Sequence, residues 1–221
     1  MKEITVNIGF KNLCPQFRGA ALMAVVTNPP TPSELWDEML QICQKIQNTY
    51  DIHTLKQTSG IEATRAAYKT MGKDPSRYRP ACEQLARRVI QGKGLNSIDT
   101  LADISNIISL YCQYSTAALD ADKIEGNKIE LGIGKANEPY EGIGRGVLNI
   151  ENLPVYRDAI GGIATPTSDN VRTMTTPNTR NLLFLINAYD GNMEKLEDAT
   201  LYTQQLLRQY ANAQELQIIY Y

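Results

Sequence analysis

The 221-residue sequence contains one histidine, one tryptophan and no long hydrophobic run. The single histidine, His53, excludes mechanisms that require a histidine pair, such as those of the usual zinc hydrolases. No Gly-x-Ser-x-Gly motif is present, so a serine or cysteine triad has little support, and His53 is expected to be an ordinary surface residue in a loop. No apolar run approaches the roughly 18 to 20 residues that span a bilayer, so we expect no membrane partner.

Cysteine is also sparse and widely spaced. The four cysteines lie at least 29 residues apart, which is neither a zinc-binding spacing nor a secreted disulfide framework. Buried free thiols are expected, and neither a metal nor a cofactor is. The first residues lack the cationic head and apolar segment of a signal peptide, so the expected location is the cytoplasm.

Charge is distributed unevenly along the chain. The net charge is −2, yet residues 64–93 contain eight Lys and Arg residues and only two acids, which leaves the rest of the chain strongly acidic. Such an asymmetry is typical of a protein with an anionic partner on one face. The alternative is a solvated helical hairpin whose cations pair with acids elsewhere in the chain. The overall acidity argues against indiscriminate binding of bulk nucleic acid, and no DNA partner is expected.

Hydrophobic periodicity predicts a mixed α/β chain whose helices gather early. Ile4, Val6 and Ile8 alternate with polar residues, as in a half-buried strand. Ser33 is expected to cap the first helix, and a Ser-x-x-Glu capping box at residues 59–62 to begin the second. The predicted helices are roughly 33–46, 59–72, 80–92, 99–112 and 193–211, and the predicted strands are 4–8, 21–27, 128–133, 146–150, 154–158, 182–188 and 216–221.

Two glycine clusters look at first like phosphate-binding loops. The segments 132–134 and 142–146 match neither the Walker A pattern nor a Gly-x-Gly-x-x-Gly sequence that opens a helix, so we interpret their glycines as turn residues. No internal repeat or long linker divides the chain. Residues 1–221 are therefore expected to form one domain.

The segment 161–180 concentrates polar side chains between two apolar strands. Its hydroxyl groups and backbone can donate hydrogen bonds to a polar ligand, and Arg172 can grip a carboxylate or phosphate with two parallel bonds. Asp169 is expected within hydrogen-bond reach of Arg172, because an unpaired guanidinium near a sheet would be costly to desolvate. The alternative is that these two residues only pair with each other and that the threonines favour β structure.

Several separated motifs resemble one known family. Residues 66–75 match the pattern Ala-Ala-Tyr-x-x-x-Gly-x-Asp-Pro, and residues 166–173 match a Pro-Thr-Ser-Asp-x-x-Arg-Thr loop. With residues 77–89, 96–110 and 119–124, they resemble the tRNA-binding and editing region, the third and fourth modules, of the bacterial phenylalanyl-tRNA synthetase beta chain, and more closely its free-standing relatives. The resemblance implies an α+β editing-domain fold, with N-terminal helices packed on a mixed sheet.

The resemblance also implies how the chain is divided and what it does. It implies an editing-domain-like core at residues 61–191, after an N-terminal extension of strands and one helix (1–60) and before a C-terminal helix and strand (192–221). In the synthetase this region hydrolyses tyrosine wrongly attached to the phenylalanine tRNA. Its pocket histidine aligns with Ala117 and a pocket glutamate with Ile186, so both polar groups are lost here. Hydrolysis of an activated aminoacyl ester still needs only a positioned water and donors for the oxyanion.

Three functions therefore remain open from the sequence. The first is a tRNA-binding, editing-type protein that hydrolyses a mischarged aminoacyl-tRNA in trans. The second is a non-catalytic RNA-binding module. The third is a pocket protein for a free amino acid or a similar polar metabolite, with the guanidinium of Arg172 taking the carboxylate.

Two groups of site residues follow from these hypotheses. Asn106 and Asp120 are equally compatible with a structural role in capping a helix end and a turn. The expected pocket residues are Asn106, Thr165, Thr167, Ser168, Asp169, Arg172 and Thr173. The expected tRNA-binding residues are Arg65, Lys69, Arg79, Arg87 and Arg88.

Overall fold

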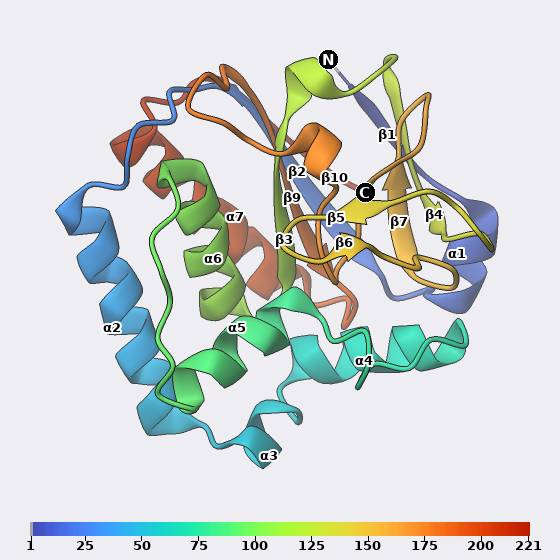
Figure 1. The fold of residues 1–221 in the computed structure, drawn as a ribbon, viewed down its shortest axis with the longest axis horizontal. Coiled ribbons are helices and arrows are strands. Elements are labelled where there is room, and N and C mark those ends of the chain that lie inside the picture. Colours follow the sequence, from blue (N-terminus) through green and yellow to red (C-terminus); the bar gives the residue numbers. More distant parts are fainter. Residues whose placement is uncertain (1) are drawn as a thin grey trace.

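The computed structural model describes residues 2–221, which form two four-stranded sheets and seven α-helices (Figure 1). The first sheet has the order β10-β2-β9-β3 and is antiparallel, whereas the second has the order β1-β4-β7-β8 and contains one parallel pair, β1 with β4. The strands are β1 (Glu3–Val6), β2 (Arg18–Val25), β3 (Ser115–Asp120), β4 (Lys128–Ile133), β5 (Glu141–Gly142), β6 (Gly146–Val147), β7 (Pro154–Arg157), β8 (Gly162–Ala164), β9 (Asn181–Ala188) and β10 (Gln214–Tyr220). The expected α+β fold class is confirmed.

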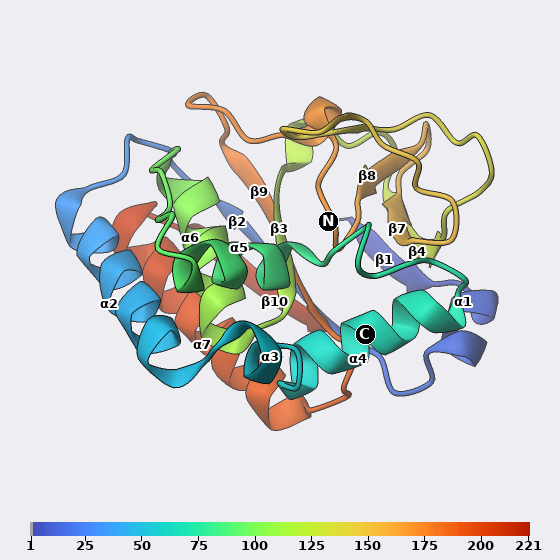
Figure 2. The same cartoon turned by 60° about the horizontal axis from the view of Figure 1, so that its bottom comes forward.

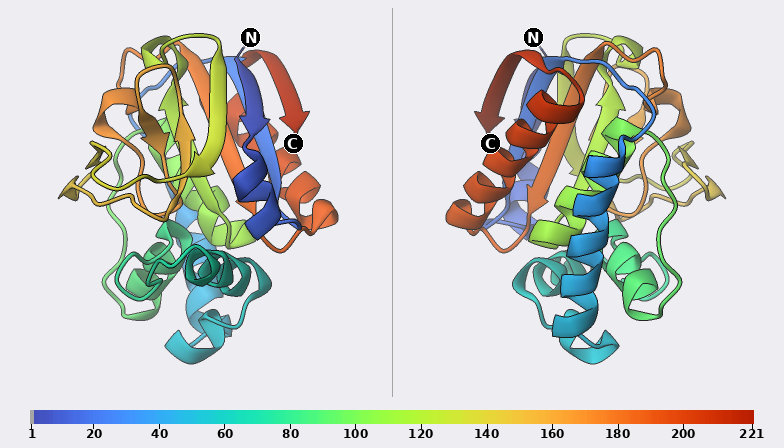
Figure 3. Two further views of the ribbon diagram at one scale, coloured as in Figure 1. Left: turned by 90° about the vertical axis from the view of Figure 1, so that its right-hand side faces the viewer. Right: turned by 90° about the vertical axis from the view of Figure 1, so that its left-hand side faces the viewer.

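The helices α2, α5, α6 and α7 form a layer on one face of the first sheet, and the second sheet, with α1 beside it, covers the other face (Figure 3). The helices α6 and α7 contact the first sheet, and α2 packs against α6. The helices are α1 (Ile8–Leu13), α2 (Ser33–Thr49), α3 (Ile52–Leu55), α4 (Ser59–Thr70), α5 (Ala81–Ile90), α6 (Thr100–Cys112) and α7 (Met193–Tyr210). Within residues 2–221, none of these helices has the length and apolar character that crossing a membrane requires.

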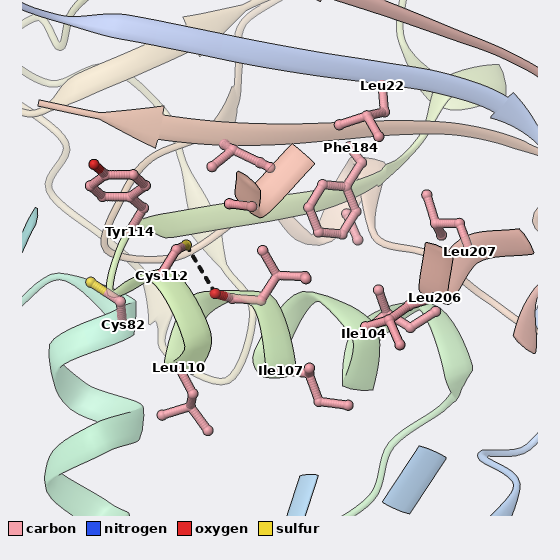
Figure 4. Packing of buried hydrophobic residues seen from close by; sticks show 14 of the residues in the cluster. Leu22, Cys82, Ile104, Ile107, Leu110, Cys112, Tyr114, Phe184, Leu206 and Leu207 are labelled. Carbon is pink, nitrogen blue, oxygen red and sulfur yellow. Dashed lines mark hydrogen bonds between the residues drawn. The ribbon is translucent and has the colours of Figure 1, made fainter. Parts of the chain in front are cut away.

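The two central strands of the first sheet supply both cores, because successive side chains of a strand point to opposite faces. In β9, Phe184 and Ile186 face the helix layer, whereas Leu183 and Leu185 pack against the second sheet. Leu22 of β2 joins Phe184 on the helix side, where the side chains of α6 and α7 meet them (Figure 4). Because β9 is buried on both faces, its sequence is a nearly continuous apolar run.

The N-terminal and C-terminal segments meet in the first sheet. The last residue, Tyr221, exchanges two backbone hydrogen bonds with Gly19 of β2, at 2.7 and 3.0 Å. Its ring lies over Gly19 so closely that a Cβ atom there would come within 2.4 Å of it, and the phenol reaches the Tyr156 hydroxyl at 2.8 Å. A larger residue at position 19 would therefore displace the Tyr221 ring.

Several predicted helix ends differ from the observed ones. Ile8 does not continue the first strand but begins α1, because the Asn7 side chain accepts the backbone N–H of Gly9 and caps that helix. Ser33 is not the cap of α2, and the predicted capping box of α4 does not form, since their N-cap residues are Pro32 and Thr58. A capping box occurs instead at α3, in the stretch around His53 that was expected to be a loop.

Strand predictions were better for long segments than for short ones. The segment 128–133 was predicted exactly as β4 has it, whereas the predicted strand 146–150 shortens to the two residues of β6. The strand β3 was not predicted, because its small residues give a weak hydrophobic alternation. Of the glycines interpreted as turn residues, Gly144 lies in the β5–β6 turn with a positive φ, whereas Gly132 lies in β4, and Gly142 and Gly146 lie in β5 and β6.

Candidate functional site

The polar loop, residues 165–173, follows β8 and is held by its own hydroxyl groups. The Thr165 hydroxyl donates to the Ser168 carbonyl at 2.9 Å and accepts two backbone N–H groups. The Thr173 hydroxyl donates to the Ile163 carbonyl at 3.2 Å. Because both threonines are buried, these bonds fix the shape of the loop and do not face solvent.

The polar loop also joins the helices to the second sheet. The hydroxyl of Thr167 lies 2.9 Å from the hydroxyl of Tyr68 on α4 and donates to the Tyr78 carbonyl at 2.9 Å. The Pro166 carbonyl accepts the first backbone N–H of α5, from Ala81, at 2.7 Å. The structure thus brings most predicted pocket residues together, but their hydroxyl groups are already partnered.

Arg172 is partnered as well, although not by the residue expected. Its two Nη atoms each donate at 2.9 Å to the carboxylate of Asp158, whose side chain is fully buried, and Nη1 also donates to the Lys123 carbonyl at 3.0 Å. The expectation that Asp169 pairs with Arg172 is wrong. Arg172 lies two residues after Asn170, whose side chain caps a 3-10 turn. Its guanidinium contacts the carboxylate of Asp158, the residue that follows β7. A free amino acid would therefore compete with Asp158 for this guanidinium.

Asp169 is the one acidic side chain of the polar loop, and its carboxylate has no hydrogen-bond partner among residues 2–221. Burial raises the pKa of this carboxyl well above its ordinary value. Beside it, the Tyr140 hydroxyl donates to the Ser168 carbonyl at 2.7 Å, and the Ile143 N–H donates to the Asp169 carbonyl at 2.9 Å. The raised pKa favours the protonated form, in which the carboxyl group can donate a proton or a hydrogen bond.

The two positions that the resemblance aligns with a pocket histidine and a pocket glutamate of the synthetase face opposite sides of the first sheet. Ala117 of β3 pairs with Leu185 of β9, and both lie between the two sheets, whereas Ile186 faces the helix layer. They do not share one pocket. The polar residue of β9 nearest to Ala117 on the inner face is Asn187, which accepts a hydrogen bond from the Tyr156 hydroxyl at 2.5 Å.

Asn106 and Asp120 have different surroundings. Asn106 is half-buried in the middle of α6, and among residues 2–221 no hydrogen bond joins its side chain to the polar loop. Asp120 has the structural role that the sequence left open: its carboxylate caps a 3-10 turn through the N–H of Asp122 and accepts the Thr179 hydroxyl at 2.8 Å.

Three of the five expected tRNA-binding residues converge on one carboxylate, and we name this group the arginine cluster: Arg65, Arg79 and Arg87 around Glu83. Glu83 is fully buried, and Arg65 donates to it at 2.8 Å while also reaching the Pro75 carbonyl. Arg79 and Arg87 lie one helical turn before and after it, with nitrogen–oxygen distances of 3.4 and 4.0 Å. Three guanidinium groups against one carboxylate leave the cluster positively charged.

The other two expected residues, Lys69 and Arg88, are exposed and form no ion pair within residues 2–221. They lie on α4 and α5, which occupy the same end of the molecule (Figure 2). Lys73 contributes nothing to this surface, because its ammonium group is buried against the carbonyls of Asn149 and Glu151. The hypothesis that all cations of the segment pair with acids elsewhere is therefore wrong for Lys69 and Arg88.

Among residues 2–221, neither buried cysteine is activated as a nucleophile. All four cysteines are free thiols; Cys82 and Cys112 are buried, as expected, whereas Cys14 and Cys43 are only half-buried. Burial raises the pKa of Cys82 to about 11 and that of Cys112 to about 12. His53 is exposed, also as expected. In the described part of the chain, no group of three or more His, Cys, Asp or Glu side chains could hold a metal ion.

Five surface cavities of about 400 to 460 Å³ can be traced, and residues of the polar loop line none of these five. The concave site expected around Arg172 is thus not among them. One of the five lies between α2 and the chain that follows α5, near Arg88. The sequence motifs do not indicate this cavity, and the signal for it is the single tryptophan, Trp36, which lines it.

Comparison with protein-family models identifies the architecture. Residues 63–212 match the model of the B3/4 domain. The chain belongs to the B3/4 domain family. This domain occurs in the phenylalanyl-tRNA synthetase beta chain, where it is associated with tRNA binding, so the family expected from the sequence is confirmed. The B3/4 match extends through α7 to residue 212, beyond the resemblance read from the motifs. A search of curated proteins gave no match.

Proposed function

We propose that the protein binds tRNA through residues 64–93, with Lys69 and Arg88 contacting phosphate groups directly. One observation carries this proposal: in a B3/4 domain, these two cations are exposed and unpaired within residues 2–221. The arginine cluster adds a positive field behind them, which attracts a polyanion at longer range. Its own guanidinium groups are committed to Glu83, so their direct contribution is smaller.

The test is tRNA affinity as a function of salt concentration. Each phosphate neutralised by a cation releases counterions, so the Lys69→Ala/Arg88→Ala double variant should bind more weakly, with a logarithmic salt slope reduced by about 1.4 to 1.8. The matched control is Lys11→Ala/Arg208→Ala, which removes two exposed cations outside the segment. Undetectable tRNA binding at low salt, or an unchanged slope in the Lys69/Arg88 variant, would overturn the proposal.

Ester hydrolysis in trans is the second candidate, and the free carboxyl of Asp169 favours it. Hydrolysis adds water across the aminoacyl ester: a water oxygen bonds to the carbonyl carbon, the bond to the ribose oxygen breaks, and that oxygen takes up a proton. A protonated Asp169 can supply this proton and regain one from the attacking water, a contribution of roughly 10²- to 10⁴-fold for a well-placed general acid. With Ala117 and Ile186 at the aligned pocket positions, we expect slow hydrolysis of an activated ester and no protease or phosphatase activity.

A panel of radiolabelled mischarged aminoacyl-tRNAs tests this second candidate, with ester loss compared with the rate in buffer. Asp169→Asn should abolish the hydrolysis of any ester that the wild type cleaves and should leave tRNA binding intact. Asp37→Asn, which changes an exposed carboxylate on α2, is the control. If every ester decays at the buffer rate while tRNA binds, the protein is a non-catalytic RNA-binding module.

A further inference from the structure

A cavity of about 460 Å³ lies between α2 and the segment that follows α5, outside the polar loop and the arginine cluster. One wall is a face of α2 that presents Trp36, Leu40, Gln44 and Gln47 at helical spacing. Trp36 is partly exposed, and Leu40 keeps 51% of its surface accessible. The wall therefore combines an aromatic ring and an apolar surface with side-chain amides.

The opposite wall is the end of α5, where the backbone itself is accessible. Gly92 and Gly94 line the cavity with φ values of 70° and 62°, and a Cβ atom at either position would meet nothing within 4 Å. The amide of Gln47 donates to the Val89 carbonyl at 2.8 Å and so joins the two walls. A ligand can approach this backbone without a side chain between them.

Two free cations flank the cavity. Arg88 directly precedes Val89, a lining residue, and Lys93 stands between the two lining glycines. The backbone N–H of Lys93 donates to the Arg88 carbonyl at 3.0 Å, so the two residues are neighbours in space as well as in sequence. Both side chains are exposed, and within residues 2–221 neither forms an ion pair.

We propose that this cavity binds one unpaired nucleotide of an RNA strand, with the base against Trp36 and the phosphates at Arg88 and Lys93. Single-stranded nucleic acid is recognised by aromatic rings that stack on bases and by cations that track the backbone. The cavity offers the ring of Trp36, and Arg88 and Lys93, which are next to lining residues in the sequence, offer the charge. The amide of Gln44 supplies the donor and acceptor that a base edge needs. An apolar peptide would leave the two cations unused, which is why the charge favours a nucleotide. The inference rests on the proposed RNA binding and names where an unpaired base goes.

Trp36 makes this site directly observable, because it is the only tryptophan of the chain. Titration with a single-stranded RNA pentamer should quench its fluorescence, whereas the same sequence in a duplex or with abasic residues should not. With a labelled pentamer, Trp36→Leu should weaken binding roughly five- to 150-fold, the range of single stacking contacts, and leave the salt slope unchanged. Arg88→Ala/Lys93→Ala should reduce that slope by about 1.4.

Two further variants keep the result interpretable. Leu40 is exposed, so Leu40→Glu should fold normally while it places a carboxylate in the cavity. It should therefore weaken binding of the pentamer even if Trp36→Leu disturbs folding. Leu201→Ala removes an exposed leucine of α7 and is the control that should change nothing.

The outcomes separate this inference from the proposed function. If tRNA binds but Trp36 is not quenched, or Trp36→Leu and Leu40→Glu bind normally, the cavity is not the site and only this inference fails. If a mononucleotide binds as tightly as the pentamer, the occupant is a free nucleotide and the inference is again wrong. If the pentamer quenches Trp36 while tRNA does not bind, the cavity site stands and the tRNA proposal falls. If neither RNA binds, both fail.

Discussion

The basic helical segment, residues 64–93, and the polar loop, residues 165–173, differ in how many of their polar groups remain available. Both stand out in the sequence for their density of side chains that bind anions or polar ligands. In the loop, the hydroxyls of Thr165, Thr167 and Thr173 and the guanidinium of Arg172 are taken by internal hydrogen bonds. In the basic segment, Lys69 and Arg88 point to solvent. A high density of polar side chains in the sequence therefore does not show how many of them remain free to bind a ligand in the folded protein.

The helical part of this comparison follows from simple geometry. Residues four apart lie on the same face of a helix, so Glu83 and Arg87 share one face of α5, and the side chain of Arg88 points about 100° away from that of Arg87. Arg79 lies just before the helix, four residues ahead of Glu83. The buried face keeps three guanidinium groups around one carboxylate, while the adjacent face stays free. The loop has no such periodicity: some of its hydrogen bonds are local, as those of Thr165 are, and others are long-range, as the contact from Arg172 to Asp158 shows.

The largest expected effect is the loss of the carboxylate in the arginine cluster. Glu83→Gln keeps the shape of the side chain but leaves three partly buried guanidinium groups without a counter-charge, which should lower the free energy of unfolding by about 3 to 5 kcal/mol. Urea denaturation measures this change. Glu62→Gln, at an exposed position of α4, should stay within about 0.5 kcal/mol. Equal stability of the two variants would show that the cluster is not held by Glu83.

A smaller effect is expected from the loop at its contact with α4. Thr167→Val removes the hydroxyl that the Tyr68 hydroxyl and the Tyr78 carbonyl share, and leaves buried polar groups unsatisfied. The free energy of unfolding should fall by about 1 to 3 kcal/mol. Thr70→Val, whose exposed hydroxyl only bonds within its own helix, is the control for the same side-chain change. A loss no larger than that of the control would mean that the loop hydroxyls are more available than the structure indicates.

How far the sequence predicts the fold depends on the length of the pattern. Long periodic segments, such as α6, α7, β4 and β9, were predicted nearly to their ends, because many residues repeat one signal. The capping serine of α2 and the capping box of α4 were wrong, since a cap depends on one local bond that several neighbouring residues can supply. The strand β3 escaped prediction because its sheet position, not its composition, makes it a strand.

The candidate site was predicted less well for a related reason. The motifs located the polar loop and the basic segment, and the family followed from them. The partners of Arg172 and of the arginine cluster did not follow, because the Asp158–Arg172 pair joins residues on either side of β8. The spacing from Arg79 to Arg87 with Glu83 between them was present in the sequence and would have predicted the cluster.

The pH dependence of stability separates two carboxyl groups near the polar loop. Burial alone would raise the pKa of Asp158, but hydrogen bonds from Arg172 and from three backbone N–H groups hold it below its ordinary value. The Asp158 carboxylate therefore stabilises the folded state at neutral pH. This stabilisation is lost as the pH falls below about 4, the pKa of an aspartate in the unfolded chain. Burial raises the pKa of Asp169, so the folded state binds its proton more tightly and loses stability as the pH rises above about 4.

Two isosteric variants test these opposite signs by urea denaturation at pH 4 and pH 8. Asp158→Asn should lower the free energy of unfolding at pH 8, and by a smaller amount at pH 4. Asp169→Asn should be more stable than the wild type at pH 8 and nearly equal to it at pH 4, because the amide never ionises. If Asp169→Asn is instead less stable at pH 8, the carboxylate has a partner and is not the free acid that ester hydrolysis requires.

The smallest expected change in stability comes from Lys69 and Arg88. Because both side chains are exposed and form no ion pair within residues 2–221, Lys69→Ala/Arg88→Ala should alter the free energy of unfolding by no more than about 0.5 kcal/mol. Urea denaturation beside the tRNA salt titration of the same protein makes the result informative. A variant that folds normally but binds tRNA with a shallower salt slope has lost phosphate contacts and nothing else. A stability loss above about 1 kcal/mol would place these cations with the arginine cluster, as structural groups, and the contrast with the polar loop would disappear.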